Sequence, residues 1–186
     1  EVGVTAQDLS VDGHVGSGHG AALFYDDMKA SVTPHGCASH EFTGECLNGE
    51  NAAWLKAAST RTVKVIPEQG AMLTHGSPAD PYWKYIYPDK KQEQWTATLE
   101  ARSVSRLFVG HSHVQFRIET SPACEIINPG SVGQPRNRDP SAQYAIIDDG
   151  GDVRFRRVPY DIAAAAAAIR EAGLPEYLAE RLFEGR

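Results

Sequence analysis

Short apolar stretches in the middle of the chain predict a series of β-strands. Residues 62–66 alternate β-branched and polar side chains, as a half-buried strand does. Two continuous apolar runs, at 71–74 and 107–109, predict buried strands. Further strands are predicted over residues 114–119, 124–127, 143–148 and 153–158, the last two joined by a hairpin at Gly150-Gly151.

Helical patterns flank these strands and close the chain. Asn48 is a suitable N-cap for a helix that contains Ala52, Ala53 and Trp54. Residues 90–102 predict a second helix, since Trp95 and Leu99 are four positions apart on one face. At the carboxyl end, Asp161 caps a run of six alanines that Gly173 and Pro175 terminate, and a last helix is predicted over residues 176–183.

The amino-terminal part of the sequence is unlike the rest. Residues 1–20 are rich in glycine and contain no convincing core strand, and the chain begins at Glu1 rather than at a methionine. We therefore expect one domain over residues 1–186, in which residues 1–47 are atypical or incomplete. The sequence is interpreted either as a fragment or as one from which segments are missing.

Composition narrows the class of protein. With 41% hydrophobic and 23% charged residues, the 186-residue chain has the composition of an ordinary soluble globular protein, and its predicted strands and helices make it an α/β domain. The net charge is −6 and no long basic run occurs, so no nucleic-acid partner is predicted. No apolar run approaches the roughly 20 residues of a membrane span, and no signal peptide is visible.

Three cysteines are too few and too irregular for a disulfide framework, and they favour reduced thiols in the cytoplasm. An alternative is a zinc cluster formed by Cys37 and Cys46 with His35 and His40, although these spacings match no common zinc motif.

Three histidines form the main candidate for chemistry. The strand at 107–109 leads into Gly110-His111-Ser112-His113, and His75 follows the strand at 71–74. On an extended segment residues two apart share one face, so His111 and His113 are expected to point into the same space. They would bind one metal ion together, or one ion each of a pair. Ligands gather outside the carboxyl ends of strands, which would bring His75 to the same edge.

A loop rich in glycine and proline follows, Asn128-Pro129-Gly130-Ser131-Val132-Gly133-Gln134-Pro135-Arg136. Its start is an ordinary type II turn sequence. A functional interpretation is that backbone N–H groups and the Ser131 hydroxyl line the site. Arg136 or Arg138 would then bind a phosphate oxygen through a guanidinium fork, and the sequence does not distinguish between them.

The order of these motifs resembles the calcineurin-like metallophosphoesterases, in particular their small bacterial and archaeal phosphodiesterase-like branch. The similarity covers residues 48–186 and includes the strand at 144–148 and the segment Val158-Pro159-Tyr160-Asp161. It implies a two-sheet β-sandwich flanked by helices. It also implies two divalent metal ions, commonly Mn, Fe, Ni, Zn or Mg, that activate water against a phosphoester. In this alignment His75 and His111 bind one ion and His113 binds the other.

The resemblance leaves the amino-terminal ligands unmatched. The family opens with an Asp-x-His motif, a Gly-Asp and a Gly-Asn-His-Asp, and the first two are not found here. Ser17-Gly18-His19-Gly20 is the one candidate for the third, and it places His19 as the catalytic histidine that helps protonate the leaving group. Three neutral imidazoles without a bridging carboxylate would bind one zinc ion better than a pair of cations.

Two functions therefore compete. The first is metal-dependent hydrolysis of a phosphodiester or phosphomonoester, with a small phosphorylated substrate. The alternative is a catalytically inactive binding module on the same scaffold. The aromatic segment at residues 82–87 would stack a base, or pack in the core or at the interface of a homo-oligomer; packing is expected for most of its rings.

Overall fold

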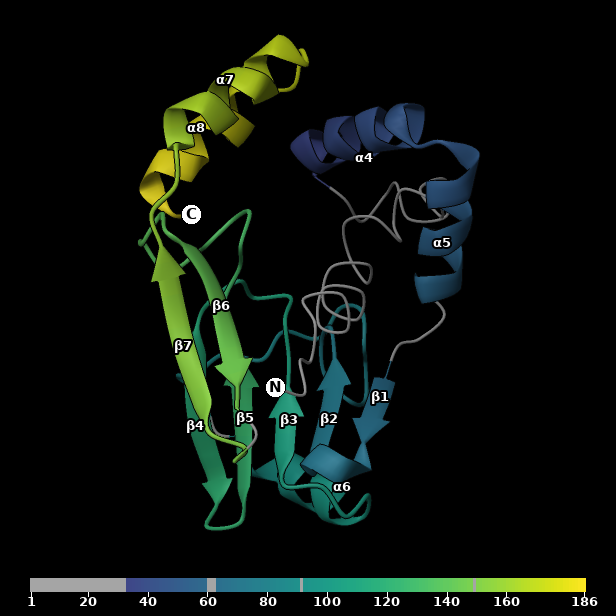
Figure 1. Cartoon of the computed structure of the whole chain (residues 1–186), viewed down its shortest axis with the longest axis vertical. Helices are drawn as coiled ribbons and strands as arrows, with labels where there is room; N and C mark the ends of the chain where they lie inside the picture. Colours follow the sequence, from purple (N-terminus) through teal and green to yellow (C-terminus); the bar gives the residue numbers. More distant parts are fainter. Residues whose placement is uncertain (1–32, 60–62, 91, 149) are drawn as a thin grey trace.

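The computed structural model describes residues 33–59, 63–90, 92–148 and 150–186 (Figure 1). Its helices and 3-10 turns are α4 (Pro34–Cys46), α5 (Gly49–Ser59), η3 (Pro67–Gln69), η4 (Glu93–Trp95), α6 (Thr96–Glu100), α7 (Ile162–Glu171) and α8 (Glu176–Glu184). Its strands are β1 (Val63–Ile66), β2 (Ala71–Thr74), β3 (Arg106–Phe108), β4 (Phe116–Ser121), β5 (Cys124–Asn128), β6 (Ala142–Ile147) and β7 (Val153–Val158).

The strands form two sheets. The larger has the order β1-β2-β3-β5-β4, in which β2, β3 and β5 are parallel and the two edge strands run antiparallel to them. The smaller is the antiparallel hairpin β6-β7. Together with the flanking helices, this confirms the predicted α/β fold with two sheets. The predicted strands are found within two residues of their expected limits.

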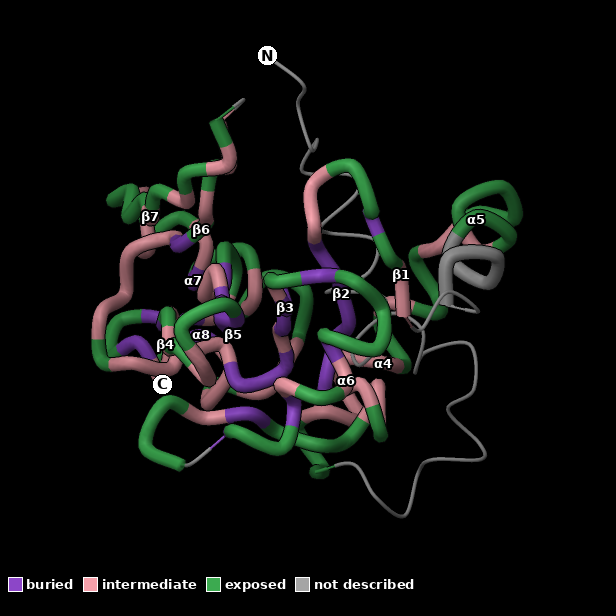
Figure 2. The backbone as a smooth tube through the Cα atoms, turned by 90° about the horizontal axis from the view of Figure 1, so that it is seen from below, coloured by how far each residue is buried: buried purple, intermediate pink, exposed green. Residues whose placement is uncertain are grey.

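Side chains of the parallel strands alternate between two apolar clusters. Met72, Leu107 and Ile126 face the cluster that contains Trp95 and Leu99. Their neighbours in sequence face the second cluster, which the β6-β7 hairpin covers: Leu73, Phe108 and Ile127, with Ile147, Val153 and Phe155 packed against them. Figure 2 shows the buried backbone concentrated on β2, β3 and β5. The central strands are thus covered on both faces, which explains their continuous apolar sequences.

The helix predicted over residues 90–102 is shorter than expected. The regular part is η4 followed by α6, and it ends because Ser103 adopts the left-handed conformation, at φ 53°. The N–H of Ser103 donates to the Glu100 carbonyl, and that of Val104 donates to Leu99. This is a Schellman ending, completed by the contact of Val104 and Leu99 in the core. The sequence did not predict this helix end, because a serine occupies the position where a glycine is usual.

The helix α4 was not predicted, whereas the predicted caps are present. Thr33 begins α4 by accepting the Gly36 N–H at 3.2 Å, but α4 buries no residue, so no amphipathic pattern marks it. Asn48 and Asp161 accept N–H groups of α5 and α7, at 2.8 and 2.9 Å. Figure 1 shows α4, α7 and α8 beyond the carboxyl ends of the parallel strands and α6 at the opposite end. Within the described ranges, no helix is long and apolar enough to cross a membrane.

Replacement of Ile126 on the parallel strand β5 tests the core assignment. Ile126 is fully buried, so Ile126→Ala is expected to lower the free energy of unfolding by about 2–5 kcal/mol. Ile146, which is 37% exposed on β6, provides a matched control with a smaller loss. Urea denaturation followed by circular dichroism measures both, and equal losses would contradict the assignment.

Candidate metal centre

The three parallel strands bring the candidate loops to one edge of the large sheet. Strand β2 ends just before His75, β3 ends just before Val109-Gly110, and β5 ends at Asn128. Backbone hydrogen bonds continue beyond the strands: Gly110 N–H donates to the His75 carbonyl at 2.8 Å, and Val109 N–H donates to Ile127 at 2.9 Å. The loops that carry the histidines are therefore held beside one another.

His75 and His111 are in direct contact. Nε2 of His75 lies 2.9 Å from Nδ1 of His111, and both residues are buried. Either a proton lies between these nitrogens or their two lone pairs converge on one ion. Two nitrogens at this separation can both reach a zinc ion at about 2.0–2.1 Å. Within the described part of the chain, the buried Nε2 of His111 has no hydrogen-bond partner. A neutral imidazole has one lone pair, so this Nε2 carries the proton if Nδ1 of His111 binds an ion together with His75.

The surroundings of His111 keep its imidazole neutral. Burial lowers the pKa of His111, and the positive charge of Arg136 lowers it further. The Trp83 backbone and the Asp80 carboxylate act in the opposite direction but do not outweigh these effects. Tyr85 stacks on the ring with centroids 3.8 Å apart. Because a metal binds only the neutral form of imidazole, this environment favours coordination.

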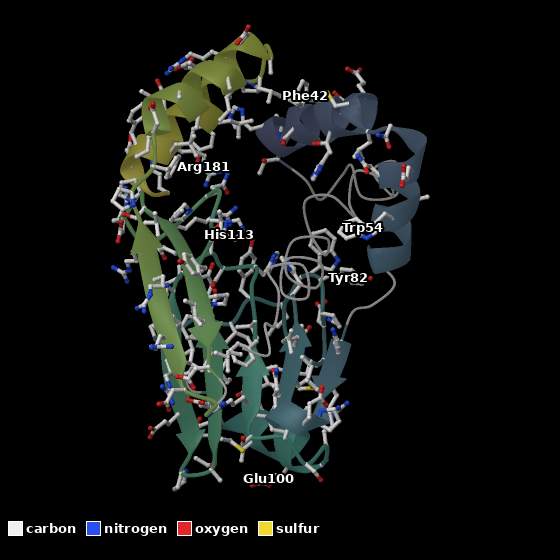
Figure 3. All side chains as sticks on the ribbon, viewed as in Figure 1. Phe42, Trp54, Tyr82, Glu100, His113 and Arg181 are labelled. Atoms are coloured by element: carbon white, nitrogen blue, oxygen red, sulfur yellow. The ribbon has the colours of Figure 1, made fainter. Side chains whose placement is uncertain are left out.

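His113 is oriented by a different contact. Its Nδ1 lies 2.8 Å from the Gln134 carbonyl oxygen, which can only accept, so Nδ1 carries the proton and Nε2 carries the lone pair. This kind of bond commonly fixes the tautomer of a metal-ligating histidine. Figure 3 shows His113 near the carboxyl ends of the strands, on the side of α8.

The expectation that His111 and His113 share one face of an extended segment is wrong. Both residues are left-handed, at φ 59° and 57°, and Ser112 N–H donates to the Gly110 carbonyl at 2.6 Å. The segment is therefore a tight turn, to which the alternation of a strand does not apply. His111 contacts His75, whereas His113 contacts Gln134.

The described residues contain only part of the predicted ligand set. Within the ranges that the structure describes, no three His, Cys, Asp or Glu side chains are grouped closely enough to hold a metal ion. This also gives no support to the alternative zinc cluster on α4, where His35 stacks on Tyr177 instead. His19 lies outside the described residues.

Asn128 connects the loops, a role that the sequence did not reveal. Its side chain is fully buried; Nδ2 donates to the Gly110 carbonyl at 2.8 Å and to the Ser112 hydroxyl at 3.0 Å. Its Oδ1 accepts the Gly130 N–H at 2.9 Å. Gly130 has φ 89°, as position i+2 of the predicted type II turn requires. A polar residue ending an otherwise buried strand was the available signal.

The loop that follows β5 contains Ser131 and the two candidate arginines. The Ser131 hydroxyl accepts the Gln134 N–H at 3.0 Å, so it stabilises the loop itself. Arg136 lies beside His113, because its N–H donates to the His113 carbonyl at 3.0 Å. Arg138 is exposed and pairs with Glu184 on α8 at 3.8 Å. Of the two arginines, Arg136 is the one beside the histidines.

The aromatic segment is less buried than expected. Trp83 and Tyr85 are 45% and 41% exposed. The neighbouring Ile86 is buried. The Tyr85 ring contacts two other rings: it stacks on His111 and, with centroids 5.5 Å apart, on Tyr87. Its loop is fixed by Asp80, whose carboxylate accepts the N–H groups of Tyr82 and Trp83. Tyr85 is therefore a neighbour of the site that sequence reasoning did not assign.

Two packed sheets with histidines on the loops at the carboxyl edge define an α/β domain of the metallophosphoesterase type. Residues 35–150 match the family model of the calcineurin-like phosphoesterase superfamily domain, and the chain belongs to this superfamily. The family comprises metal-dependent phosphoester hydrolases, which generally bind divalent metal ions.

Relatives in bacteria and archaea support this membership. The chain is 31% identical over 168 residues to the uncharacterized protein MJ0912 of Methanocaldococcus jannaschii, covering 82% of this chain and 67% of that protein. It is similar to the crystal structure of a metallophosphoesterase from Sphaerobacter thermophilus, with a TM-score of 0.65, 33% identity, and coverage of 84% and 69%. The hypothetical protein PH1004 from Pyrococcus horikoshii shares the fold, with a TM-score of 0.76, 22% identity, and coverage of 91% and 71%.

Removal of the Asn128 side chain tests its role in joining the loops. Asn128→Ala leaves the buried Ser112 hydroxyl and the half-buried Gly110 carbonyl without their side-chain donor, so we expect the free energy of unfolding to fall by about 1–3 kcal/mol. Asn51, exposed on α5, provides the control, with Asn51→Ala close to wild type. Guanidinium denaturation is the measurement, and a wild-type midpoint for Asn128→Ala would contradict the role.

Proposed function

We propose that this protein hydrolyses a small phosphodiester or phosphomonoester with the help of two divalent metal ions. The observation that carries this proposal is the contact of two buried histidines, in which Nε2 of His75 lies 2.9 Å from Nδ1 of His111, so that the two lone pairs can converge on one ion. A divalent ion between these two nitrogens would accept both lone pairs, and the Nε2 of His111 would then carry the proton. Membership of the phosphoesterase superfamily supports the same reaction class.

Each histidine has a stated role in the proposal. His75 and His111 hold one ion, and His113 offers its Nε2 to the second because Gln134 holds the proton on Nδ1. When bound, divalent ions supply Lewis acidity and a hydroxide nucleophile at neutral pH. His19, outside the described residues, is proposed to protonate the leaving group.

Burial of the site favours the binding of an ion. Tyr85 covers one face of His111, and the neutral state of that imidazole follows from burial and from the charge of Arg136. Because the ring is already neutral and largely dehydrated, little proton release or desolvation accompanies coordination. The cytoplasmic location expected from the sparse cysteines is part of this proposal, and the described structure contains no disulfide between Cys46 and Cys124.

One observation favours the alternative function, a catalytically inactive binding module. No carboxylate joins the histidines in a group of three within the described ranges, and two neighbouring cations need negative charge to offset their repulsion. The two functions differ in a simple respect: the module folds and binds without turnover, whereas the hydrolase takes up metal and turns over substrate.

Loss of the His111 side chain is the direct test. His111→Ala should lower metal affinity by more than the roughly 10–100-fold that loss of an outer-shell partner costs, and turnover should fall with it. Bound metal is measured by elemental analysis after dialysis against Mn, and turnover with bis(p-nitrophenyl) phosphate. His113→Ala, at a less buried position, should behave in the same way.

The control is His35→Ala, because His35 lies on α4 and stacks on Tyr177 of α8. It should retain metal and turnover. A wild-type protein without bound metal or turnover would overturn the proposed hydrolysis and leave the binding module. Full metal content and activity in His111→Ala would exclude His111 as a ligand.

A further inference from the structure

Arg136 differs from most arginines of the described chain in its surroundings. Arg106, Arg117, Arg138 and Arg157 each pair with a carboxylate. The guanidinium of Arg136 has no carboxylate partner in the described ranges; its Nε and Nη2 donate to the amide oxygen of Gln134 at 3.2 and 2.7 Å. A guanidinium has five N–H donors, so this neutral acceptor leaves donors and the full positive charge available.

Gln134 holds both Arg136 and His113, through different groups. Its backbone carbonyl accepts the His113 Nδ1–H at 2.8 Å, and its side-chain oxygen accepts the two Arg136 bonds. Its own N–H donates to the Ser131 hydroxyl at 3.0 Å. The position of the guanidinium relative to His113 is therefore set by one residue on a braced loop.

A second arginine lies on the helix against which this loop is docked. Arg138 N–H donates to the Gly185 carbonyl at 2.9 Å, which ties the loop to the end of α8. Arg181 of α8 (labelled in Figure 3) lies over the Tyr177 ring at 5.1 Å, and its Nε donates to the main-chain oxygen of Arg186. Burial lowers the pKa of Arg181, and the charge of Arg136 acts in the same direction. An anion bound here would relieve this repulsion.

We propose that Arg136 binds the non-bridging oxygens of the substrate's phosphoryl group, and that Gln134 is the positioning residue that aims it beside His113. A planar guanidinium fork suits two oxygens of one phosphoryl group, which a lysine matches only as a point charge. This inference rests on the proposed function for the identity of the substrate. It settles the choice between Arg136 and Arg138 in favour of the residue whose charge is not already paired.

The test uses the full chain loaded with Mn, with bis(p-nitrophenyl) phosphate as substrate and inorganic phosphate as competing ligand. Loss of a charged hydrogen-bonding partner predicts that Arg136→Gln raises KM and the phosphate inhibition constant roughly 10–100-fold. The effect on kcat should be smaller and Mn content unchanged. Arg136→Lys should recover part of the affinity. Arg138→Gln is the matched control and should retain wild-type values.

Gln134 variants separate positioning from folding. Gln134→Leu keeps the carbonyl that orients His113 but removes the acceptor for Arg136, so KM should rise with Mn content unchanged. Gln134→Glu should raise KM further, because its carboxylate pairs with the guanidinium and repels phosphate. Wild-type KM and phosphate affinity in Arg136→Gln, equal effects of Arg136→Gln and Arg138→Gln, or loss of Mn from Arg136→Gln would overturn the inference.

Phosphate binding without metal keeps this inference distinguishable from the proposed function. The thermal stability of the metal-free chain is measured in phosphate and in chloride at equal ionic strength. Stabilisation by phosphate that Arg136→Gln abolishes and Arg138→Gln retains supports the site even if the wild type shows no turnover. Turnover by a wild type whose phosphate affinity is the same as that of Arg136→Gln overturns the site and leaves hydrolysis standing.

Discussion

The parallel pairing of β2, β3 and β5 is the constraint on which the rest of the structure depends. Met72, Leu107 and Ile126 are aligned by their register, as are Leu73, Phe108 and Ile127. Because both faces are buried in apolar clusters, each strand is fixed by packing above and below. A slip of one residue would exchange the two faces. The same register places the three strand ends at one edge, so the position of the histidines is a consequence of core packing.

Two residues with amide side chains, the buried Asn128 and the half-buried Gln134, carry this order from the strands into the loops. Asn128 binds the 110–112 turn and the 128–130 turn to one another through its side chain. Gln134 holds His113 through its backbone carbonyl and Arg136 through its side-chain oxygen. Amides suit this task because each offers donors and acceptors without a charge to desolvate. The loops are thus held by satisfied polar groups, while the positive charge of Arg136 stays unneutralised among the described residues.

Two features of the site destabilise the folded chain. His111 and His113 are both left-handed, a conformation that costs of order 1–3 kcal/mol for a non-glycine residue. The unsatisfied Nε2 of buried His111 adds a penalty of about 1–3 kcal/mol. Strain and an unmet hydrogen-bonding group in one place are typical of functional sites, where a ligand completes what the protein leaves open. The proposed metal ion would bind the lone pair at Nδ1 of His111, and a phosphoryl group would accept the free donors of Arg136.

The sequence by itself determined the strands, the hairpin, the caps at Asn48 and Asp161 and the type II turn at Gly130, because each depends on residues close together in the chain. It also indicated which loops meet, since carboxyl ends of parallel strands share an edge.

The sequence did not determine the turn at 110–113, where Asn128 and the left-handed backbone override strand alternation. The helix α4 escaped notice because it buries nothing. Only the tertiary structure decided that His75 contacts His111, that Gln134 fixes His113, and that Arg136 rather than Arg138 lies beside it. These pairings join residues on separate loops, and local sequence contains no information on the distances that packing sets between them.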